Sequence, residues 1–120
     1  LINHCDDMPA AYMLADIVVS ASVEPEAFGR VAVEAQALGR LVIATDHGAT
    51  KETIENGSTG WLIKPNDANA MAKILKTLLS YTREERKKIS TLAMQHINNN
   101  FSKEEMCEKT IKLYKSMIYN

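Results

Sequence analysis

One apolar run, LVIAT from Leu41 to Thr45, most constrains how this chain can fold. It carries no charge, follows Gly39 and Arg40, and leads into the turn residues DHGAT. A continuous apolar run of this length between turn signals is typical of a strand that is buried on both faces. Because such strands occur mainly in parallel sheets that are covered by helices, we expect an α/β fold.

Five other segments in the first half have strand or helix patterns. The strand candidates are 16–20 (DIVVS) and 61–64 (WLIK), and the helix candidates are 7–15, 30–38 and 51–55. Strands that alternate with helices favour a parallel sheet with right-handed crossovers. The sequence therefore predicts a Rossmann-like sheet of about three strands flanked by helices.

Residues 68–120 change to a purely helical pattern, and we expect them to be the C-terminal helices of a single domain that spans 1–120. Thr82 and Glu85 have the spacing of a capping box, which predicts a helix start. Three sets of residues recur at helical spacing: Met71, Ile74, Leu75, Leu78 and Leu79; Ile89, Leu92, Ala93 and Ile97; Met106, Thr110, Leu113, Tyr114, Met117 and Ile118. Three strands are about half of a usual doubly wound sheet, and the sequence starts without Met, so we expect a further part upstream.

The charges divide unevenly between the two halves of the chain. The net charge is -1, but residues 1–60 hold nine acids and three bases, whereas residues 61–120 hold six acids and eleven bases. The basic half predicts either solvated helix faces or a surface for an acidic partner domain or an anionic membrane. There is no block of five like charges and no interleaving of bases with aromatic residues, so we expect no nucleic-acid partner.

The cysteines and the apolar runs indicate the cellular setting. Cys5 and Cys107 lie near opposite ends and form no CxxC pair, which argues against a disulfide framework and a zinc site. No secretory signal is recognisable and no apolar run has the length of a membrane span. We expect a cytoplasmic protein, with the inner face of the membrane as the place where a basic surface would bind.

Polar residues and glycines follow the first two strand candidates. Ligands of open α/β sheets bind at the carboxyl ends of the strands, so Glu26, Phe28, Gly29, His47 and Gly48 should gather at one edge. Taken singly, each of these residues has an ordinary interpretation as a solvated acid, a turn glycine or a structural histidine.

The helix that starts near Gly29 or Arg30 points its first N–H groups at the same edge, where they favour an anion such as phosphate. Glu34 lies about one turn further on, where a carboxylate could accept two hydrogen bonds from a vicinal diol. Phosphate at the helix start and ribose one turn later together describe a nucleotide. The alternative for Glu34 alone is a solvated side chain.

The combination of motifs is more specific than its members. Glu26 and Glu34 form E-x7-E with Phe-Gly after the first Glu, and then come an apolar strand, D-x-G-x-x-x-E and G-W-L-I. This order resembles the donor-binding, C-terminal domain of family 4 glycosyltransferases of the GT-B fold. The resemblance runs from about Asp7 to Asp67, through ADIVVSAS, EAFGRVAVEA, GRLVIATDHGATKETIENGSTGWLI and PND.

The resemblance implies a role for each matching residue. Glu26 would contact hydroxyls of the transferred sugar as the catalytic residue, and Phe28, Gly29 and Arg30 would offer backbone N–H groups to the donor diphosphate. Glu34 would bind the ribose. A sixth and a seventh match, Gly48 and Glu52, follow the next strand. The resemblance also implies that the donor is a nucleotide sugar, that the reaction retains the anomeric configuration of the sugar, and that no bound metal or other cofactor is needed.

The match has departures, and other functions stay open. Leu41 and Ala49 stand where the family often has proline and glycine, and the family's phosphate-neutralising bases and acceptor domain would lie upstream. We therefore expect this chain to be part of a glycosyltransferase that acts in the synthesis of bacterial lipopolysaccharide or capsule. By itself, the chain should transfer no sugar. The alternatives are a non-catalytic remnant or partner subunit and a fragment of a sugar-nucleotide epimerase. An NAD-dependent enzyme is disfavoured because no GxGxxG follows a strand.

Overall fold

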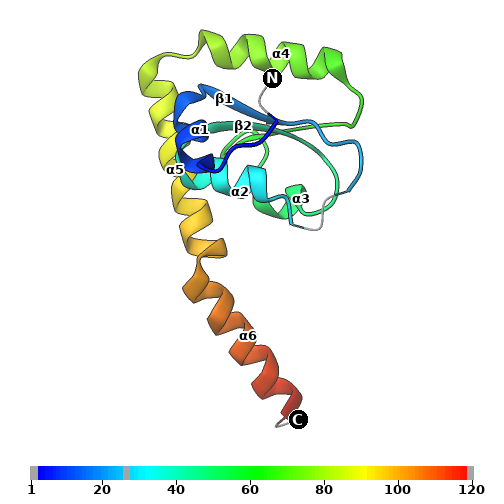
Figure 1. Cartoon of the computed structure of the whole chain (residues 1–120), viewed down its shortest axis with the longest axis vertical. Coiled ribbons are helices and arrows are strands. Elements are labelled where there is room, and N and C mark those ends of the chain that lie inside the picture. Colours follow the sequence, from blue (N-terminus) through cyan, green and yellow to red (C-terminus); the bar gives the residue numbers. More distant parts are fainter. Residues whose placement is uncertain (1–2, 26–27, 119–120) are drawn as a thin grey trace.

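A computed structural model describes residues 3–25 and 28–118 and has the expected α/β architecture (Figure 1). The elements of this part of the chain are, in order, α1 (Met8–Leu14), β1 (Ile17–Ser20), α2 (Arg30–Ala37), β2 (Leu41–Thr45), α3 (Thr50–Thr53), β3 (Trp61–Ile63), α4 (Ala68–Ser80), α5 (Arg83–Phe101) and α6 (Lys103–Ile118).

The sheet has the order β1-β2-β3, and both pairs of neighbours are parallel. Ile17 pairs with Leu41, and Ile43 pairs with Trp61. The central strand β2 is buried along its whole length. Its uninterrupted apolar sequence therefore reflects cover on both faces, as the sequence predicted.

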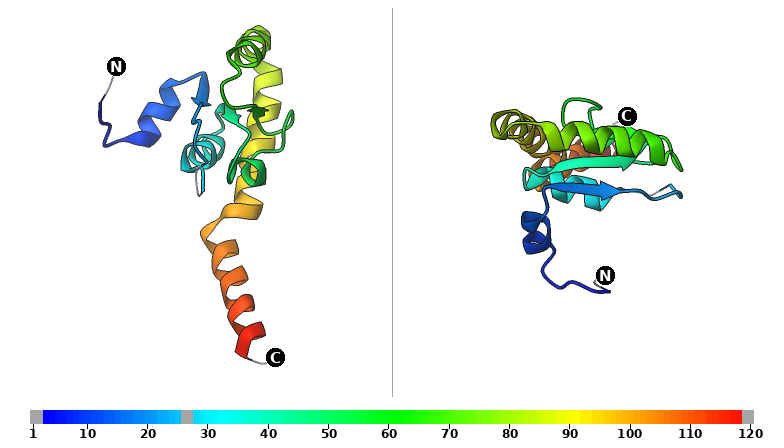
Figure 2. Two further views of the ribbon diagram at one scale, coloured as in Figure 1. Left: turned by 90° about the vertical axis from the view of Figure 1, so that its right-hand side faces the viewer. Right: turned by 90° about the horizontal axis from the view of Figure 1, so that it is seen from above.

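Alternate residues of β2 enter two separate hydrophobic clusters, because successive side chains of a strand point to opposite faces. Val42 and Ala44 join the cluster on the α1 and α2 side, and Leu41 and Ile43 join the cluster on the α4 side. In Figure 1, α4 crosses one face of the sheet, while α2 and α3 lie on the other. The views in Figure 2 place α1 and the N-terminal residues beyond β1.

Helices α4 and α5 begin where the sequence predicted, but the apolar sides of the C-terminal helices are only partly buried. Leu78 is fully buried in α4 and Ala93 in α5, whereas Leu79 and Leu92 on the same two predicted sides are exposed. Helix α6 projects away from the sheet, and none of its residues is buried (Figures 1 and 2). Helical spacing predicts which side of a helix is apolar, but it does not predict which other element packs against that side.

The start of α5 is fixed by the predicted capping box. The Glu85 backbone N–H donates to Thr82 Oγ1 at 3.2 Å, and the Thr82 backbone N–H donates to Glu85 Oε2 at 2.7 Å. Two N–H groups that a helix leaves without partners are thereby satisfied.

We expect Thr82→Ala to lower the free energy of unfolding by about 1 kcal/mol, because it removes the N-cap acceptor. Urea unfolding followed by Trp61 fluorescence measures this loss. The control is Thr91→Ala, the same substitution at an exposed position inside α5, which should leave stability unchanged or slightly raised because Ala is the better helix former. Equal losses in both variants would contradict the capping role.

Candidate active site

Two loops meet at the carboxyl ends of β1 and β2. Thr45 Oγ1, at the end of β2, donates a hydrogen bond to the backbone carbonyl of Ser22 at 2.6 Å. His47 Nε2 lies 2.6 Å from the same carbonyl oxygen. Gly29 is buried, and a Cβ added to it would lie 3.4 Å from Cγ2 of Thr50. The predicted convergence of the two loops is therefore confirmed.

Helix α2 begins at this edge with a glycine in the left-handed region. Gly29 is the N-cap residue, with φ of +66°, a conformation that glycine adopts without steric cost. The first N–H groups of any helix have no partner within the helix, and its dipole makes that end positive. The amino end of α2 can therefore receive an anion without rearrangement of the helix.

The Glu34 carboxylate, one turn into α2, is held from two sides. The Tyr12 hydroxyl donates to Oε2 at 2.9 Å. Arg30 donates to Oε1 through Nε at 3.2 Å and through Nη2 at 3.0 Å. These bonds occupy three of the roughly four acceptor positions of a carboxylate. A vicinal diol can thus bind through both hydroxyls only if Arg30 releases Oε1.

Release of Arg30 is inexpensive. The Arg30 side chain is 80% exposed and that of Glu34 is 35% exposed, and exposed ion pairs within a helix contribute only about 0.3–0.5 kcal/mol. Tyr12, by contrast, is buried and packs into the cluster beside α2. We infer that Tyr12 fixes the orientation of the carboxylate and that Arg30 is its exchangeable partner.

A pocket of about 490 Å³ opens beside this carboxylate. Tyr12, Arg30 and Glu34 line it together with apolar side chains from α1 and the end of α2, among them Pro9 and Leu38. Its volume lies within the range of small-molecule sites, and its mostly apolar wall with a few polar groups is typical of them. The arrangement can therefore hold a flat apolar group next to a diol.

The other predicted site residues are exposed or lie outside the described part of the chain. Glu26, the predicted catalytic residue, lies outside the described residues. Phe28 and Glu52 are exposed, and so is Gly48, which has a φ of +58°. Arg40, which was not a predicted site residue, immediately precedes β2 and therefore lies at the opposite edge of the sheet. It cannot neutralise an anion at the amino end of α2.

Tyr12 is the residue of this arrangement that sequence reasoning missed. Its burial raises its pKa to about 12, and the hydrogen bond to the neighbouring Glu34 carboxylate acts in the same direction. The one signal in the sequence was an aromatic residue with a polar tip in a short apolar helix. That signal does not say that α1 packs beside α2, which is a contact between segments 22 residues apart.

Within residues 3–25 and 28–118, no group of three or more His, Cys, Asp or Glu side chains could hold a metal ion. The helices described here include none that is both long and apolar enough to cross a membrane.

The raised pKa of Tyr12 predicts a specific loss of stability in alkali. The ordinary pKa is 10.0 and the folded value is about 12, so the neutral phenol stabilises the fold fully below pH 10. This contribution is lost as the pH rises through 12, because the unfolded chain ionises first. Tyr12→Phe should therefore lower stability by about 1 kcal/mol at pH 7, and its deficit should shrink between pH 10 and pH 12.

Urea unfolding at pH 7 to 12 measures this difference, with Tyr114→Phe as the matched control. Tyr114 is exposed on α6, so its variant should follow the parent chain at every pH. A deficit of Tyr12→Phe that stays constant up to pH 12 would show that the phenol is not held neutral by burial and Glu34.

Proteins of known fold or activity that resemble this chain include the following three. A crystallised glycosyltransferase from Rickettsia africae is 41% identical, with a TM-score of 0.89 over 97% of this chain and 31% of that protein. The α-1,3/1,6-mannosyltransferase alg-2 of Neurospora crassa is 33% identical over 77% of this chain and 20% of its own length. HepE of Anabaena, solved in complex with UDP-glucose, is 28% identical, with a TM-score of 0.81 over 91% of this chain and 30% of HepE.

These matches agree on the family. The chain spans between 20% and 31% of the length of each of these three proteins, so they describe its fold and descent and not a complete enzyme. The family model described as "Glycosyl transferases group 1" matches residues 1–96, which include the whole sheet, α2 and Glu34. This chain belongs to the group 1 glycosyltransferase family and has the α/β structure of its GT-B members.

Proposed function

We propose that this chain is the donor-binding part of a family 4 glycosyltransferase, which transfers a sugar from a nucleotide-diphosphate sugar to a glycan or lipid-linked acceptor. One observation carries the proposal: the amino end of α2 and the carboxylate of Glu34, which Tyr12 holds, lie one helical turn apart at the same edge of the sheet. The E-x7-E spacing supports the family 4 subclass. UDP-glucose in the related HepE structure supports a nucleotide-sugar donor.

The proposed roles of the residues combine this geometry with the family resemblance. The diphosphate would accept hydrogen bonds from backbone N–H groups of Phe28, Gly29 and Arg30 at the positive end of α2. The ribose hydroxyls would bind Glu34 after the Arg30 side chain leaves Oε1. The freed guanidinium is then a cation one turn from the diphosphate. Gly48 would keep the neighbouring turn open.

In the reaction, the bond between the anomeric carbon of the sugar and the diphosphate oxygen breaks, and that carbon forms a bond to the oxygen of an acceptor hydroxyl. The proton of the hydroxyl would pass to the departing diphosphate. Negative charge grows on the departing diphosphate, and the amino end of α2 would stabilise it more strongly than in the ground state. Glu26 would hold hydroxyls of the transferred sugar. Our proposal includes retention of the anomeric configuration and no bound metal ion, both on the strength of the family resemblance.

We propose that another part of the protein binds the acceptor and supplies the bases that neutralise the diphosphate, and that the 120 residues alone transfer no sugar. We further propose that the protein acts in the synthesis of bacterial lipopolysaccharide or capsule, in the cytoplasm and at the inner face of the membrane. Two free cysteines, Cys5 and Cys107, support a reducing compartment.

Calorimetric titration of the chain with UDP, GDP and ADP tests the donor site. We expect one nucleotide, UDP by the similarity to HepE, to bind, and Glu34→Ala to weaken that binding at least about tenfold, because it removes charged acceptors of hydrogen bonds. Tyr12→Phe should weaken it less, because the carboxylate remains.

The control is Glu104→Ala, which removes an exposed carboxylate in the first turn of α6 and should leave affinity unchanged. Thermal unfolding of every variant establishes that the fold is intact. A well-folded chain that binds none of the three nucleotides, or binds one equally well without the Glu34 carboxylate, would contradict the proposed donor site.

A second candidate is a non-catalytic partner subunit, and the exposed apolar side chains of α6 favour it. Leu113, Tyr114, Met117 and Ile118 are all more than half exposed, more apolar surface than a solitary helix end usually presents to water. Sedimentation that shows self-association, lost in Leu113→Lys, together with no nucleotide binding, would favour this candidate. A monomer that binds UDP would exclude it.

A further inference from the structure

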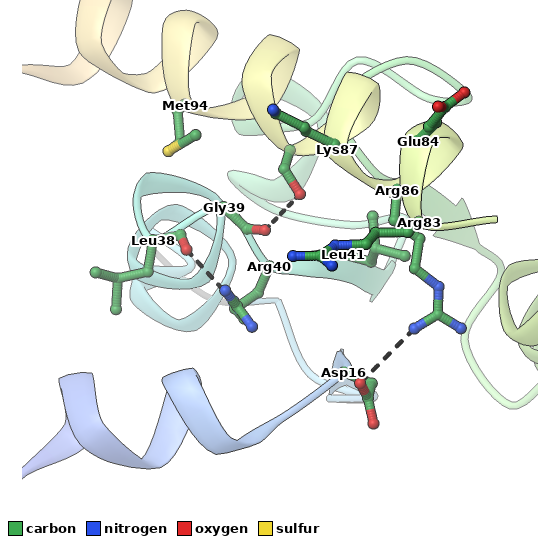
Figure 3. Close-up of a pocket in the computed structure, with 11 residues that line it drawn as sticks. Asp16, Leu38, Gly39, Arg40, Leu41, Arg83, Glu84, Arg86, Lys87 and Met94 are labelled. Atoms are coloured by element: carbon green, nitrogen blue, oxygen red, sulfur yellow. Dashed lines mark hydrogen bonds and ion pairs between the residues drawn. The ribbon is translucent and has the colours of Figure 1, made fainter. Parts of the chain in front are cut away.

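A second concave site lies at the amino ends of β1 and β2, at the edge of the sheet opposite to the proposed donor site. It is a pocket of about 760 Å³. Its floor is the turn between α2 and β2, and one wall is the first three turns of α5 (Figure 3). Asp16, which precedes β1, lies on the far side. We call it the amino-edge pocket.

Four cationic side chains line the amino-edge pocket: Arg40, Arg83, Arg86 and Lys87. Two acids, Asp16 and Glu84, also line it, so the lining has an excess of two positive charges. In the first sixty residues Arg40 is one of only three bases, and the fold brings it together with three bases of α5. This gathering was not visible in the sequence, because 43 residues separate Arg40 from Arg83.

Backbone contacts hold two of the three guanidinium groups in place. Arg40 donates through Nε to the Leu38 carbonyl and through Nη1 to the Ala15 carbonyl, both at 3.3 Å. Arg86 donates through Nη2 to the Leu78 carbonyl at 3.3 Å, and its Nη1 lies 3.7 Å from Asp16 Oδ1. Carbonyl groups fix these side chains without neutralising them, so the pocket is partly preorganised and stays positive.

The other two cations, Arg83 and Lys87, are available to a ligand. Among the described residues, Arg40, Arg83 and Lys87 form no ion pair with a carboxylate. Arg86 Nε is buried and has no hydrogen-bond partner there, which is costly for a charged group. Figure 3 shows Arg83 reaching across the pocket toward Arg40.

We propose that the amino-edge pocket binds a small molecule with a phosphate or diphosphate group. Guanidinium forks match phosphate oxygens in geometry, and several cations around one concave site match a multiply charged anion better than a single carboxylate. The exposed acids Asp16 and Glu84 at its rim would repel a flat anionic bilayer, so a soluble anion fits better than a membrane. The proposal does not depend on the donor site, because the pocket lies at the other end of the strands.

Titration of the ¹⁵N-labelled chain with pyrophosphate, followed by NMR, tests this site residue by residue. We expect saturable shifts at the amides of Gly39, Arg40 and residues 83–90, and weaker binding at higher ionic strength. The double variant Arg83→Glu/Lys87→Glu should weaken this binding about tenfold or more, since each contact is a hydrogen bond between charged groups.

The control is Lys76→Glu/Lys88→Glu, which changes the net charge equally at two exposed lysines that do not line the pocket. It should change affinity less than about twofold, as expected for charges that contact the ligand only through screened solvent. No shift at the pocket, or equal weakening by both double variants, would overturn the proposal. So would binding to phosphatidylglycerol vesicles that needs Arg83 and Lys87 while pyrophosphate does not bind.

Discussion

Burial of β2 on both faces is the constraint on which the rest of this structure depends. Its five residues are all buried, and alternate side chains enter the two clusters under the flanking helices. A strand in this position cannot be reached by a tight hairpin from a parallel neighbour, so each connection crosses the sheet through a helix. The parallel order then brings every loop that follows a strand to one edge.

That edge and its opposite have different electrostatic characters. At the carboxyl edge the charge is supplied by backbone, through the amino end of α2, and by the single carboxylate of Glu34, which Tyr12 orients. At the amino edge it is supplied by side chains, since Arg40 and three bases of α5 surround one pocket. The same crossovers that create the first site therefore separate it from the second by the length of a strand.

The sequence predicted the elements and the first edge well, because both depend on local patterns. The runs LVIAT and DIVVS predicted β2 and β1, and the spacing of Thr82 and Glu85 predicted the start of α5. The order of strands and loops predicted that Gly29 lies close to the turn that contains His47. The sequence did not predict that Tyr12 holds Glu34. It also did not predict that α6 has no buried residue. Both depend on contacts between distant segments, which periodicity does not report.

The central claim is that the amino end of α2 receives the phosphates of a nucleotide whose ribose reaches Glu34. Mapping of UDP binding by NMR on the ¹⁵N-labelled chain tests it most directly. The claim predicts the largest amide shifts at Phe28, Gly29 and Arg30, with smaller ones at Glu34 and in the turn after β2. Shifts confined to other parts of the chain, while these amides stay unchanged, would contradict it.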